Sequence, residues 1–301
     1  MGHSVSTTVE APFPYRHELA EMPHWDAARR RLCYVDINHG TVNELDVTTG
    51  DRYVIELTVP LGFAMPVAGS GVRVCGEGND LVAIDAAGNE LGRLPVEPGR
   101  AGNRMNEGKP DPKGRLWFGT MSKTREPEQA ALYRFDTDGL ARIRTITTGN
   151  GTDWDVERGR MYHVDSPTQR IDVFDYDVAT GDVENVRTWV TIDPNDGLPD
   201  GLTLDGDGCV WLALFQGGAV RRYDPDGAVM CEIALPTPFV TCPAFGGDDL
   251  TTLFVTSSQH KIPPEERAGD PLAGALFAID TGVAGRPANL LSPDVAATVI
   301  G

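Results

Sequence analysis

The sequence predicts an all-β fold, a six-bladed β-propeller with four antiparallel strands in each blade. Three observations favour it. Short apolar or alternating runs, each closed by a turn dipeptide, recur along the chain. Two families of these runs repeat about every 40–50 residues, and helical periodicity is hard to find. Since a repeated all-β unit of this length is typical of propellers, we expect a single domain over residues 1–301.

The first family of runs is apolar, with an aromatic residue near its centre. These aromatic residues lie at positions 34, 117, 162, 211 and 254, which are 83, 45, 49 and 43 residues apart. The first gap equals about two periods, and a weaker copy at Val72-Arg73-Val74 falls near its middle. Each run is therefore predicted to be a strand of one blade.

The second family follows the first and consists of an apolar residue, an aspartate and a glycine turn. Its six copies are spaced 39, 51, 41, 47 and 56 residues apart. Their aspartates are Asp46, Asp85, Asp136, Asp177, Asp224 and Asp280. Such a turn suits a β-hairpin, because glycine adopts positive φ without steric cost. A β-sandwich with accidental spacing is the alternative, but a sandwich does not need six matched hairpins.

Charge and hydropathy argue against some classes of partner. The chain has 44 acidic and 26 basic residues, a formal net charge of −18. This charge repels phosphate backbones and anionic lipid surfaces, so we expect neither a nucleic-acid nor a membrane partner. No stretch approaches the roughly 18 apolar residues of a membrane span. We expect a monomer or a weak homo-oligomer.

Cysteine usage and the first residues predict a cytoplasmic protein. The segment 1–10 is polar and has no apolar run resembling a signal peptide. Five scattered cysteines lack the spacing of metal ligands or redox pairs, and we interpret them as reduced thiols. They are Cys33, Cys75, Cys209, Cys231 and Cys242.

Four segments are unlike ordinary strand or turn sequence, and each precedes the aromatic run of a different blade. They span residues 21–25, 104–111, 148–154 and 199–205. Equal positions in successive blades of a propeller converge on one end of its axis. We therefore expect four side chains to meet there: Glu21, Asn106, Asn150 and Asp200.

Two carboxylates and two amides form an oxygen-rich set. Hard divalent cations prefer such ligands, whereas softer metals favour thiolate or imidazole. With only about three protein ligands, positions remain for water and substrate, as metal catalysis requires. The set predicts one divalent metal ion in the tunnel.

Each segment alone also has a structural interpretation. Asn150-Gly151 and Asp200-Gly201 could be plain hairpin turns, Glu21 a solvated carboxylate and Arg104 a partner in a surface ion pair. The functional interpretation depends on the shared blade position. A serine hydrolase is not favoured, since the chain has no Gly-x-Ser-x-Gly motif. The histidines have no evident nucleophile to serve, and we interpret His24 and His260, like the others, as structural or exposed.

A series of motifs runs through most of the chain. In order they are Glu21-x-Pro23-x-Trp25, GRLWFGTM at 114–121, Asn150-Gly151, Tyr162 with Asp165-Ser166-Pro167, and Pro199-Asp200-Gly201. Over roughly residues 15–260 they resemble the gluconolactonase, regucalcin (senescence-marker protein) and luciferin-regenerating enzyme family. The resemblance implies a six-bladed propeller with a central metal site. It also implies a metal-dependent hydrolase that opens a sugar lactone to the aldonic acid.

The resemblance assigns roles by position. Glu21, Asn150 and Asp200 look like the metal ligands, for calcium, zinc, manganese or magnesium. Asp200 also looks like the general base, which would take a proton from the attacking water and help deliver it to the ring oxygen. Arg104 and Asn106 look like contacts to substrate hydroxyls.

Two positions depart from the family pattern. Glu107, which we include in the substrate-binding set, stands where the family usually has Asp. Thr124 stands where regucalcin-like members place a substrate-binding Glu, so one carboxylate for a polyol is missing. The choice of lactone is therefore open.

Two other functions also stay open. A phosphotriester or fluorophosphate hydrolase uses similar propellers and metals. A non-catalytic propeller could bind calcium or a protein partner without turnover. Comparing lactone with organophosphate turnover, and both with metal binding, separates the three functions.

Overall fold

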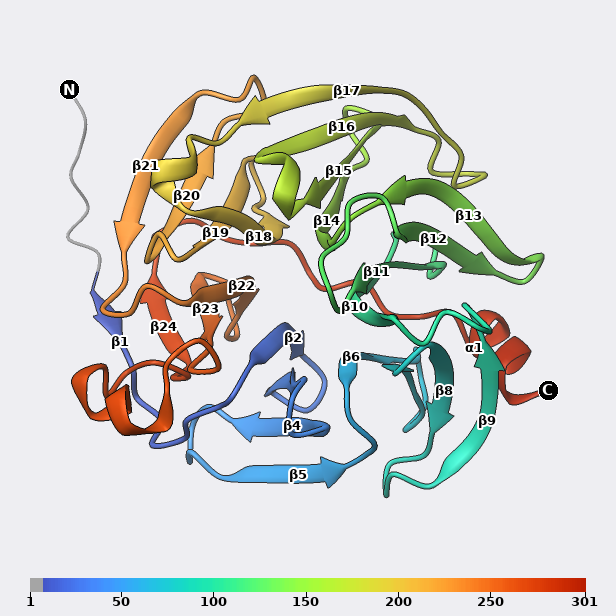
Figure 1. Ribbon diagram of the computed structural model, residues 1–301, viewed down its shortest axis with the longest axis horizontal. Coiled ribbons are helices and arrows are strands. Elements are labelled where there is room, and N and C mark those ends of the chain that lie inside the picture. The colour runs from blue at the N-terminus through green and yellow to red at the C-terminus, as the bar shows by residue number, and fades with distance from the viewer. Residues whose placement is uncertain (1–7) are drawn as a thin grey trace.

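Six four-stranded antiparallel sheets surround a common axis in the computed structural model, which describes residues 8–301 (Figure 1). The predicted all-β six-bladed propeller is thus confirmed. The blades, each from its innermost strand outward, are β2 (Ala20–Asp26), β3 (Arg31–Asp36), β4 (Thr41–Asp46), β5 (Arg52–Glu56); β6 (Leu61–Pro66), β7 (Arg73–Glu77), β8 (Asp80–Ile84), β9 (Glu90–Pro95); β10 (Asn103–Pro110), β11 (Leu116–Ser122), β12 (Ala130–Asp136), β13 (Gly139–Ile146); β14 (Gly149–Asp155), β15 (Arg160–Asp165), β16 (Arg170–Tyr176), β17 (Val183–Thr191); β18 (Leu198–Leu204), β19 (Val210–Phe215), β20 (Ala219–Tyr223), β21 (Val229–Ala234); and β22 (Val240–Gly246), β23 (Thr252–Ser257), β24 (Phe277–Asp280), β1 (Val9–Glu10).

The two repeat families correspond to the second and third strands of the blades. The aromatic runs form β3, β11, β15, β19 and β23, and the weak copy at Val72-Arg73-Val74 overlaps β7. Each apolar–aspartate pair lies at the end of a third strand, with the aspartate in the last position of the strand or directly after it. Tyr34, Trp117, Tyr162 and Trp211 are each at most 2% exposed. These second-strand aromatics therefore fill the core of the blades.

The sixth copy of the hairpin motif does not lead into a hairpin. The outer strand of the last blade is β1, and Val9 pairs with Ile279 of β24. The first described residues therefore close the ring, and Thr281-Gly282 leads out of the sheet. The segment 1–10, expected to lack a leader, lies mostly outside the described residues.

The end of the chain crosses the ring instead. We call residues 281–301 the C-terminal strap. Gly285 bridges to Asp205, Arg286 Nη1 donates to the Trp154 carbonyl at 3.2 Å, and Leu291 bridges to Val67. Between the last two, Asn289 Nδ2 donates to the Pro110 carbonyl at 3.1 Å. The strap thus contacts four blades before ending on the second, where Figure 1 shows its red helix beside β9.

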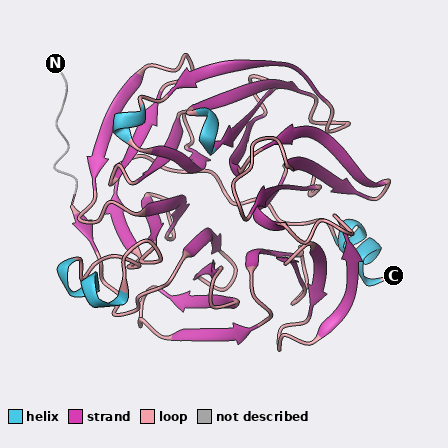
Figure 2. Ribbon diagram, viewed as in Figure 1, coloured by secondary structure: helices cyan, strands magenta, loops and turns pink. Residues whose placement is uncertain are grey.

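Helices are few and short (Figure 2). They are η1 (Ser166–Thr168), η2 (Pro194–Asp196), η3 (Pro264–Gly269) and α1 (Pro293–Ile300). The N-terminus of α1 has ordinary helix signals: Pro293 is in its first turn, and Ser292 Oγ accepts from the Asp294 backbone N–H at 3.2 Å. Within residues 8–301, no helix has the length and apolar character needed to cross a membrane.

Every innermost strand contains a β-bulge against its neighbour, at equivalent positions in all six blades. A bulge inserts one extra residue and re-aims the side chains on either side of it. As a result, residues three apart can both face the tunnel, at opposite ends of it. Glu21 and His24 of β2 form one such pair, and Asp200 and Thr203 of β18 another.

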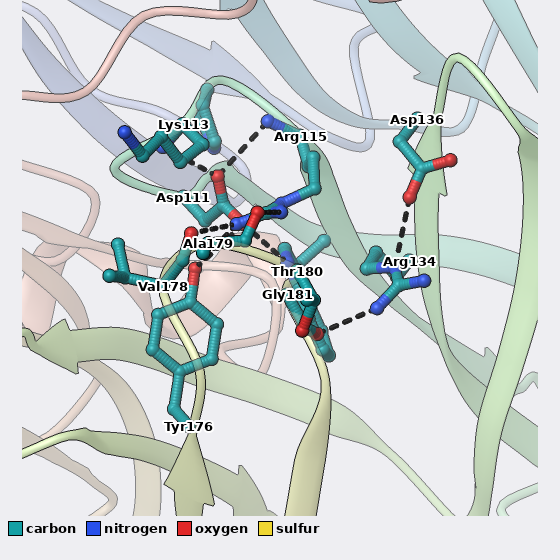
Figure 3. A network of polar contacts seen from close by, with 12 residues as sticks. Asp111, Lys113, Arg115, Arg134, Asp136, Tyr176, Val178, Ala179, Thr180 and Gly181 are labelled. Carbon is teal, nitrogen blue, oxygen red and sulfur yellow. Dashed lines mark hydrogen bonds and ion pairs between the residues drawn. The ribbon is translucent and has the colours of Figure 1, made fainter.

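Buried aspartates close the turn after the innermost strand in several blades. Asp111 follows β10 and is fully buried. Its carboxylate accepts from Arg115 Nε at 2.6 Å, from Tyr176 Oη at 2.9 Å and from Trp117 Nε1 at 3.2 Å, as Figure 3 shows for the first two. Since Tyr176 belongs to the next blade, this aspartate also ties two blades together.

Candidate active site

The four side chains expected to converge line one cavity of about 300 Å³ at one end of the tunnel. Glu21 comes from β2, Asn106 from β10, Asn150 from β14 and Asp200 from β18. Four blades therefore contribute one residue each. Arg104, the other residue expected at the substrate, also lines the cavity. The remaining lining residues are Leu19, Met121, Arg125, Thr148, Ser166, Pro167, Leu198, Phe215 and His260.

The glycines after Asn150 and Asp200 lie inside strands and do not form hairpin turns. A Cβ on Gly151 would lie 2.7 Å from the Asp200 carbonyl oxygen, and one on Gly201 would collide with the Cys242 side chain. Glycine is required at both places because neighbouring innermost strands approach so closely. This approach brings the Asn150 and Asp200 side chains to one cavity.

A chain of hydrogen bonds orients the two amides. Arg104 Nη1 donates to Asn106 Oδ1 at 2.7 Å, and Asn106 Nδ2 donates to Asn150 Oδ1 and, at 2.8 Å, to the Gly149 carbonyl. Asn150 Nδ2 donates to Ser166 Oγ at 2.6 Å. The network spans two blades and aims both amide oxygens with little freedom.

Ser166 connects this network to the next blade. Its hydroxyl donates to the Pro199 carbonyl at 2.6 Å, directly before Asp200. The sequence motif around residue 166 includes this serine, but its spacing indicates no role in the site. In the structure the serine holds Asn150 in place from behind.

The two carboxylates of the cavity are buried, at 5% exposure for Glu21 and 8% for Asp200. Burial raises the pKa of Glu21 to about 8, against the opposing effects of the Met22 N–H and the Arg104 charge. The Asp200 pKa lies well above its usual range, because of burial first and then the charges of Glu21 and Glu107. Two neighbouring carboxylates thus lack enough positive charge nearby.

Their hydrogen bonding is also incomplete. Glu21 Oε2 accepts from the Met22 N–H at 3.2 Å, where Met22 has a φ of 50° beside the bulge. No hydrogen bond from residues 8–301 reaches the Asp200 carboxylate. A buried carboxylate with incomplete hydrogen bonding lowers the stability of the folded protein unless a ligand supplies the missing partners.

Glu107 is not among the residues that line the cavity. It is 6% exposed, and one ligand atom from each of Glu107, Glu21 and Cys242 lies within 4.8 Å of the others. Its Oε1 has no hydrogen-bond partner in the described structure. Burial and the Glu21 charge raise the pKa of Glu107 well above its usual range. The structure therefore places it beside a predicted metal ligand and away from the cavity.

Three cavity residues carry no signal in the repeat. Arg125 lies on the loop after β11, Phe215 ends β19, and His260 follows β23. His260, expected to be structural or exposed, is half-buried in the cavity wall, and its Nδ1 lies 3.1 Å from Ser258 Oγ. Burial lowers its pKa to about 4, so the imidazole is neutral near pH 7.

A second cavity, of about 330 Å³, lies at the opposite end of the innermost strands. Its charged pair is satisfied: Lys109 Nζ lies 2.7 Å from Asp153 Oδ2, and Asp153 also accepts from the Leu204 N–H at 3.0 Å. His24 Nε2 and Trp154 Nε1 in its wall are buried without a partner among the described residues. Burial lowers the pKa of His24 to about 4, which leaves that ring neutral. The unsatisfied carboxylates are at the other end.

Fold and cavity together define a β-propeller with an oxygen-donor site at one mouth of its tunnel. The chain belongs to the SMP-30/gluconolactonase/LRE-like family, whose sequence profile matches residues 19–259. The resemblance seen in the motifs is thereby confirmed.

Three relatives illustrate the family. The chain is 46% identical over 184 residues to a Bacillus subtilis protein named "Putative sugar lactone lactonase YvrE", a match covering 60% of this chain and 63% of that one. It is 35% identical to the 6-deoxy-6-sulfogluconolactonase of Pseudomonas putida, over 89% of this chain and 92% of the relative. A solved calcium-binding protein, regucalcin of Agrobacterium tumefaciens, superposes with a TM-score of 0.86 at 26% identity, covering 92% and 95% of the two chains.

Proposed function

We propose that the protein is a divalent-metal-dependent lactonase that opens a sugar lactone to the aldonic acid. One observation carries the proposal: buried carboxylate and amide oxygens from four blades line one cavity, and the hydrogen bonding of the two carboxylates is incomplete. The names of two relatives, a sugar lactone lactonase and a sulfogluconolactonase, support a sugar lactone as the substrate.

The residues present fit a divalent cation. Glu21, Asn150 and Asp200 would hold it, with one amide and two carboxylates as oxygen donors. A cation among them would offset the burial, and the repulsion from Glu21 and Glu107, that raise the pKa of Asp200. The calcium-binding neighbour supports calcium, and zinc, manganese and magnesium also accept such donors. When bound, the metal would polarise the lactone carbonyl and lower the pKa of water.

The chain's own groups would move the proton and orient the sugar. As water attacks the carbonyl carbon and the bond to the ring oxygen breaks, one proton must pass from water to that oxygen. Asp200 would carry it, since no hydrogen bond from residues 8–301 engages its carboxylate. Arg104 and Asn106, fixed to one another at 2.7 Å, would contact the sugar hydroxyls.

We assign Glu107 a different part from direct substrate contact. Its carboxylate lies within 4.8 Å of Glu21 and outside the cavity lining, which supports an action through Glu21. Glu107→Gln should therefore weaken metal affinity more than it raises the KM for a lactone. An increase in KM at saturating metal, with metal affinity intact, would return Glu107 to the substrate-binding set.

The test is a lactone panel read by a pH indicator, on protein stripped of metal and reloaded with calcium, zinc, manganese or magnesium in turn. We expect metal-restored turnover of at least one sugar lactone. Glu21→Gln should lower metal affinity, and excess metal should restore much of its rate. A phosphotriester and a fluorophosphate belong in the same panel. Faster turnover of either than of every lactone would reassign the chemistry.

A calcium-binding propeller without turnover is the second candidate, favoured by the oxygen-only donor set and by the calcium-binding neighbour. Titration calorimetry on the same protein separates the two. Calcium binding with no hydrolysis across the panel would support that role and reject the lactonase.

We propose that the protein works in the cytoplasm. All five cysteines lie within residues 8–301, and none forms a disulfide there. Free thiols, four of them buried, are typical of a reducing compartment.

A further inference from the structure

We propose that the lactone carries an anionic group away from its ring carbonyl, and that Arg125 binds this group at the rim of the cavity. The inference rests on the proposed function and names the substrate class of that site. A carboxylate, a sulfonate or a phosphate on the sugar would each supply the required charge.

A cavity that holds a divalent cation would have an excess of positive charge, which favours an anionic ligand. It is lined by two carboxyl groups, Glu21 and Asp200, and two guanidinium groups, Arg104 and Arg125, while His260 is neutral. Even with both carboxyl groups ionised, their charges only balance those of the two arginines. A bound divalent cation would leave two positive charges uncompensated, in a protein whose net charge is −18. An anionic ligand restores neutrality there.

Arg125 is free to meet such a ligand. No carboxylate among residues 8–301 lies within ion-pair distance of it, and its side chain donates no hydrogen bond there. Arg104, in contrast, is engaged by the Met105 carbonyl and by Asn106. Arg104 therefore belongs to the reacting end of the cavity, whereas Arg125 is an unengaged cation at its rim.

The loop that carries Arg125 has a defined shape. The Arg125 backbone N–H donates to the Ser122 carbonyl at 3.0 Å, and Ser122 Oγ lies 3.0 Å from Thr124 Oγ1. Arg125 has a φ of 57°, a conformation that non-glycine residues adopt rarely and mostly where the surrounding structure requires it. The turn presents Arg125 to the cavity and holds Thr124 out of its lining.

A neighbouring cation strengthens the local field. Lys261 follows the cavity residue His260 and is exposed, and its pKa is lowered first by partial desolvation and then by the charge of Arg125. The rim thus gathers positive charge, which would attract an anionic sugar against the net charge of the protein. This attraction should weaken as salt is added.

The test compares a neutral lactone, glucono-δ-lactone, with anionic ones, 6-phosphoglucono-δ-lactone and glucaro-lactone, on the metal-loaded full chain. We expect a higher kcat/KM for an anionic lactone, and a preference that shrinks with salt. Arg125→Gln should lower the ratio of anionic to neutral kcat/KM by about 10- to 100-fold, mostly through KM, as for loss of a hydrogen bond to a charged group. Arg125→Lys should retain part of that ratio.

Lys123→Gln is the matched control. Lys123 is an exposed cation of the same loop that donates to the Ala101 carbonyl at 2.9 Å and does not line the cavity. It should leave the ratio unchanged. Equal losses on neutral and anionic lactones in Arg125→Gln, or a preference for the neutral lactone in the unmodified chain, would overturn the inference and leave the lactonase intact. If no lactone is turned over, the proposed function itself fails.

Discussion

Asp200 and Asp205 are five residues apart and lie at opposite ends of the same innermost strand. Asp205 is fully buried and accepts from Arg222 Nε at 2.8 Å, from Trp211 Nε1 at 2.9 Å and from the Cys209 N–H at 3.0 Å. Asp200 is 8% exposed and accepts no hydrogen bond from residues 8–301. The protein therefore buries two nearby aspartates in opposite ways, one with hydrogen-bond partners and one without.

The difference separates a structural carboxylate from one reserved for a ligand. A buried charge is tolerated when an ion pair and hydrogen bonds complete it, as they do for Asp205 and for Asp111. The Asp200 carboxylate lacks such an ion pair and such hydrogen bonds, and the neighbouring Glu21 adds more negative charge. We infer that the fold supplies partners where the carboxylate must hold blades together. It withholds them where a metal and a substrate must enter.

The largest expected effect is on catalysis. Asp200→Asn keeps an oxygen that can touch a cation but removes the proton-accepting charge, so lactone hydrolysis should fall by about 10²–10⁴-fold at saturating metal. Rates measured against metal concentration check this, with circular dichroism to confirm the fold. Full recovery at high metal would show that Asp200 is a ligand only, and the base would have to be sought elsewhere.

Asp205→Asn should show the opposite pattern. It breaks a buried ion pair with Arg222 and should lower the free energy of unfolding by about 3–5 kcal/mol. The variant that remains folded should keep a kcat close to that of the unmodified protein, because Asp205 does not line the cavity. Urea unfolding and initial rates measure the two quantities. A stable but inactive Asp205→Asn variant would contradict the assignment of Asp205 to a structural role.

A pH dependence should follow from Glu21. Its pKa rises from an ordinary value of 4.5 to about 8 in the folded protein, so the folded state keeps a proton that the unfolded chain loses. The metal-free protein should therefore lose stability as pH rises from about 4.5 to about 8, at up to about 1.4 kcal/mol per pH unit. Urea unfolding in chelator over this range tests it. Saturating metal, or Glu21→Gln, should flatten the slope, and a slope that survives both would place its origin elsewhere.

The smallest expected effect is that of Asp200→Asn on the free energy of unfolding. In the metal-free protein, Asp200→Asn removes a buried and unpartnered carboxylate, and the free energy of unfolding should rise by about 1 kcal/mol. With metal bound, the same change should lower stability, since a ligand charge is lost. Thermal unfolding with and without metal gives both signs in one experiment. The same sign in both states would mean that no metal binds at Asp200.

Much of the fold and of the cavity can be predicted from the sequence, because both repeat. The six apolar–aspartate pairs lie at the ends of the six third strands, and the equal blade positions of Glu21, Asn106, Asn150 and Asp200 do bring them to one cavity. Periodicity carries this information even where one copy is weak, as at Val72-Arg73-Val74.

The rest of the fold and of the cavity depends on tertiary contacts that the sequence repeat does not indicate. The closure of the last blade pairs Val9 with Ile279 across nearly the whole chain, so the sixth turn could not be distinguished from the other five. Arg125 and His260 lie on loops whose paths depend on tertiary packing. Glu107 directly follows Asn106 inside the bulge between Met105 and Gly108, where the usual alternation of side chains cannot be read from the sequence, and the structure places it outside the cavity lining.

The C-terminal strap has a consequence for the order of folding during synthesis. The first blade can pair its strands as soon as residues 20–56 have left the ribosome, but β1 must wait for β24, and the second blade receives α1 only from residues 293–300. Chains emerge N-terminal part first, and contacts between distant residues form late. A ribosome-bound chain stopped before residue 277 contains β22 and β23 but no β24, so β1 has no strand to pair with and the last blade lacks its two outer strands. Every residue that lines the cavity lies between positions 19 and 260, so the wall of the cavity is synthesised before the strand that completes the last blade.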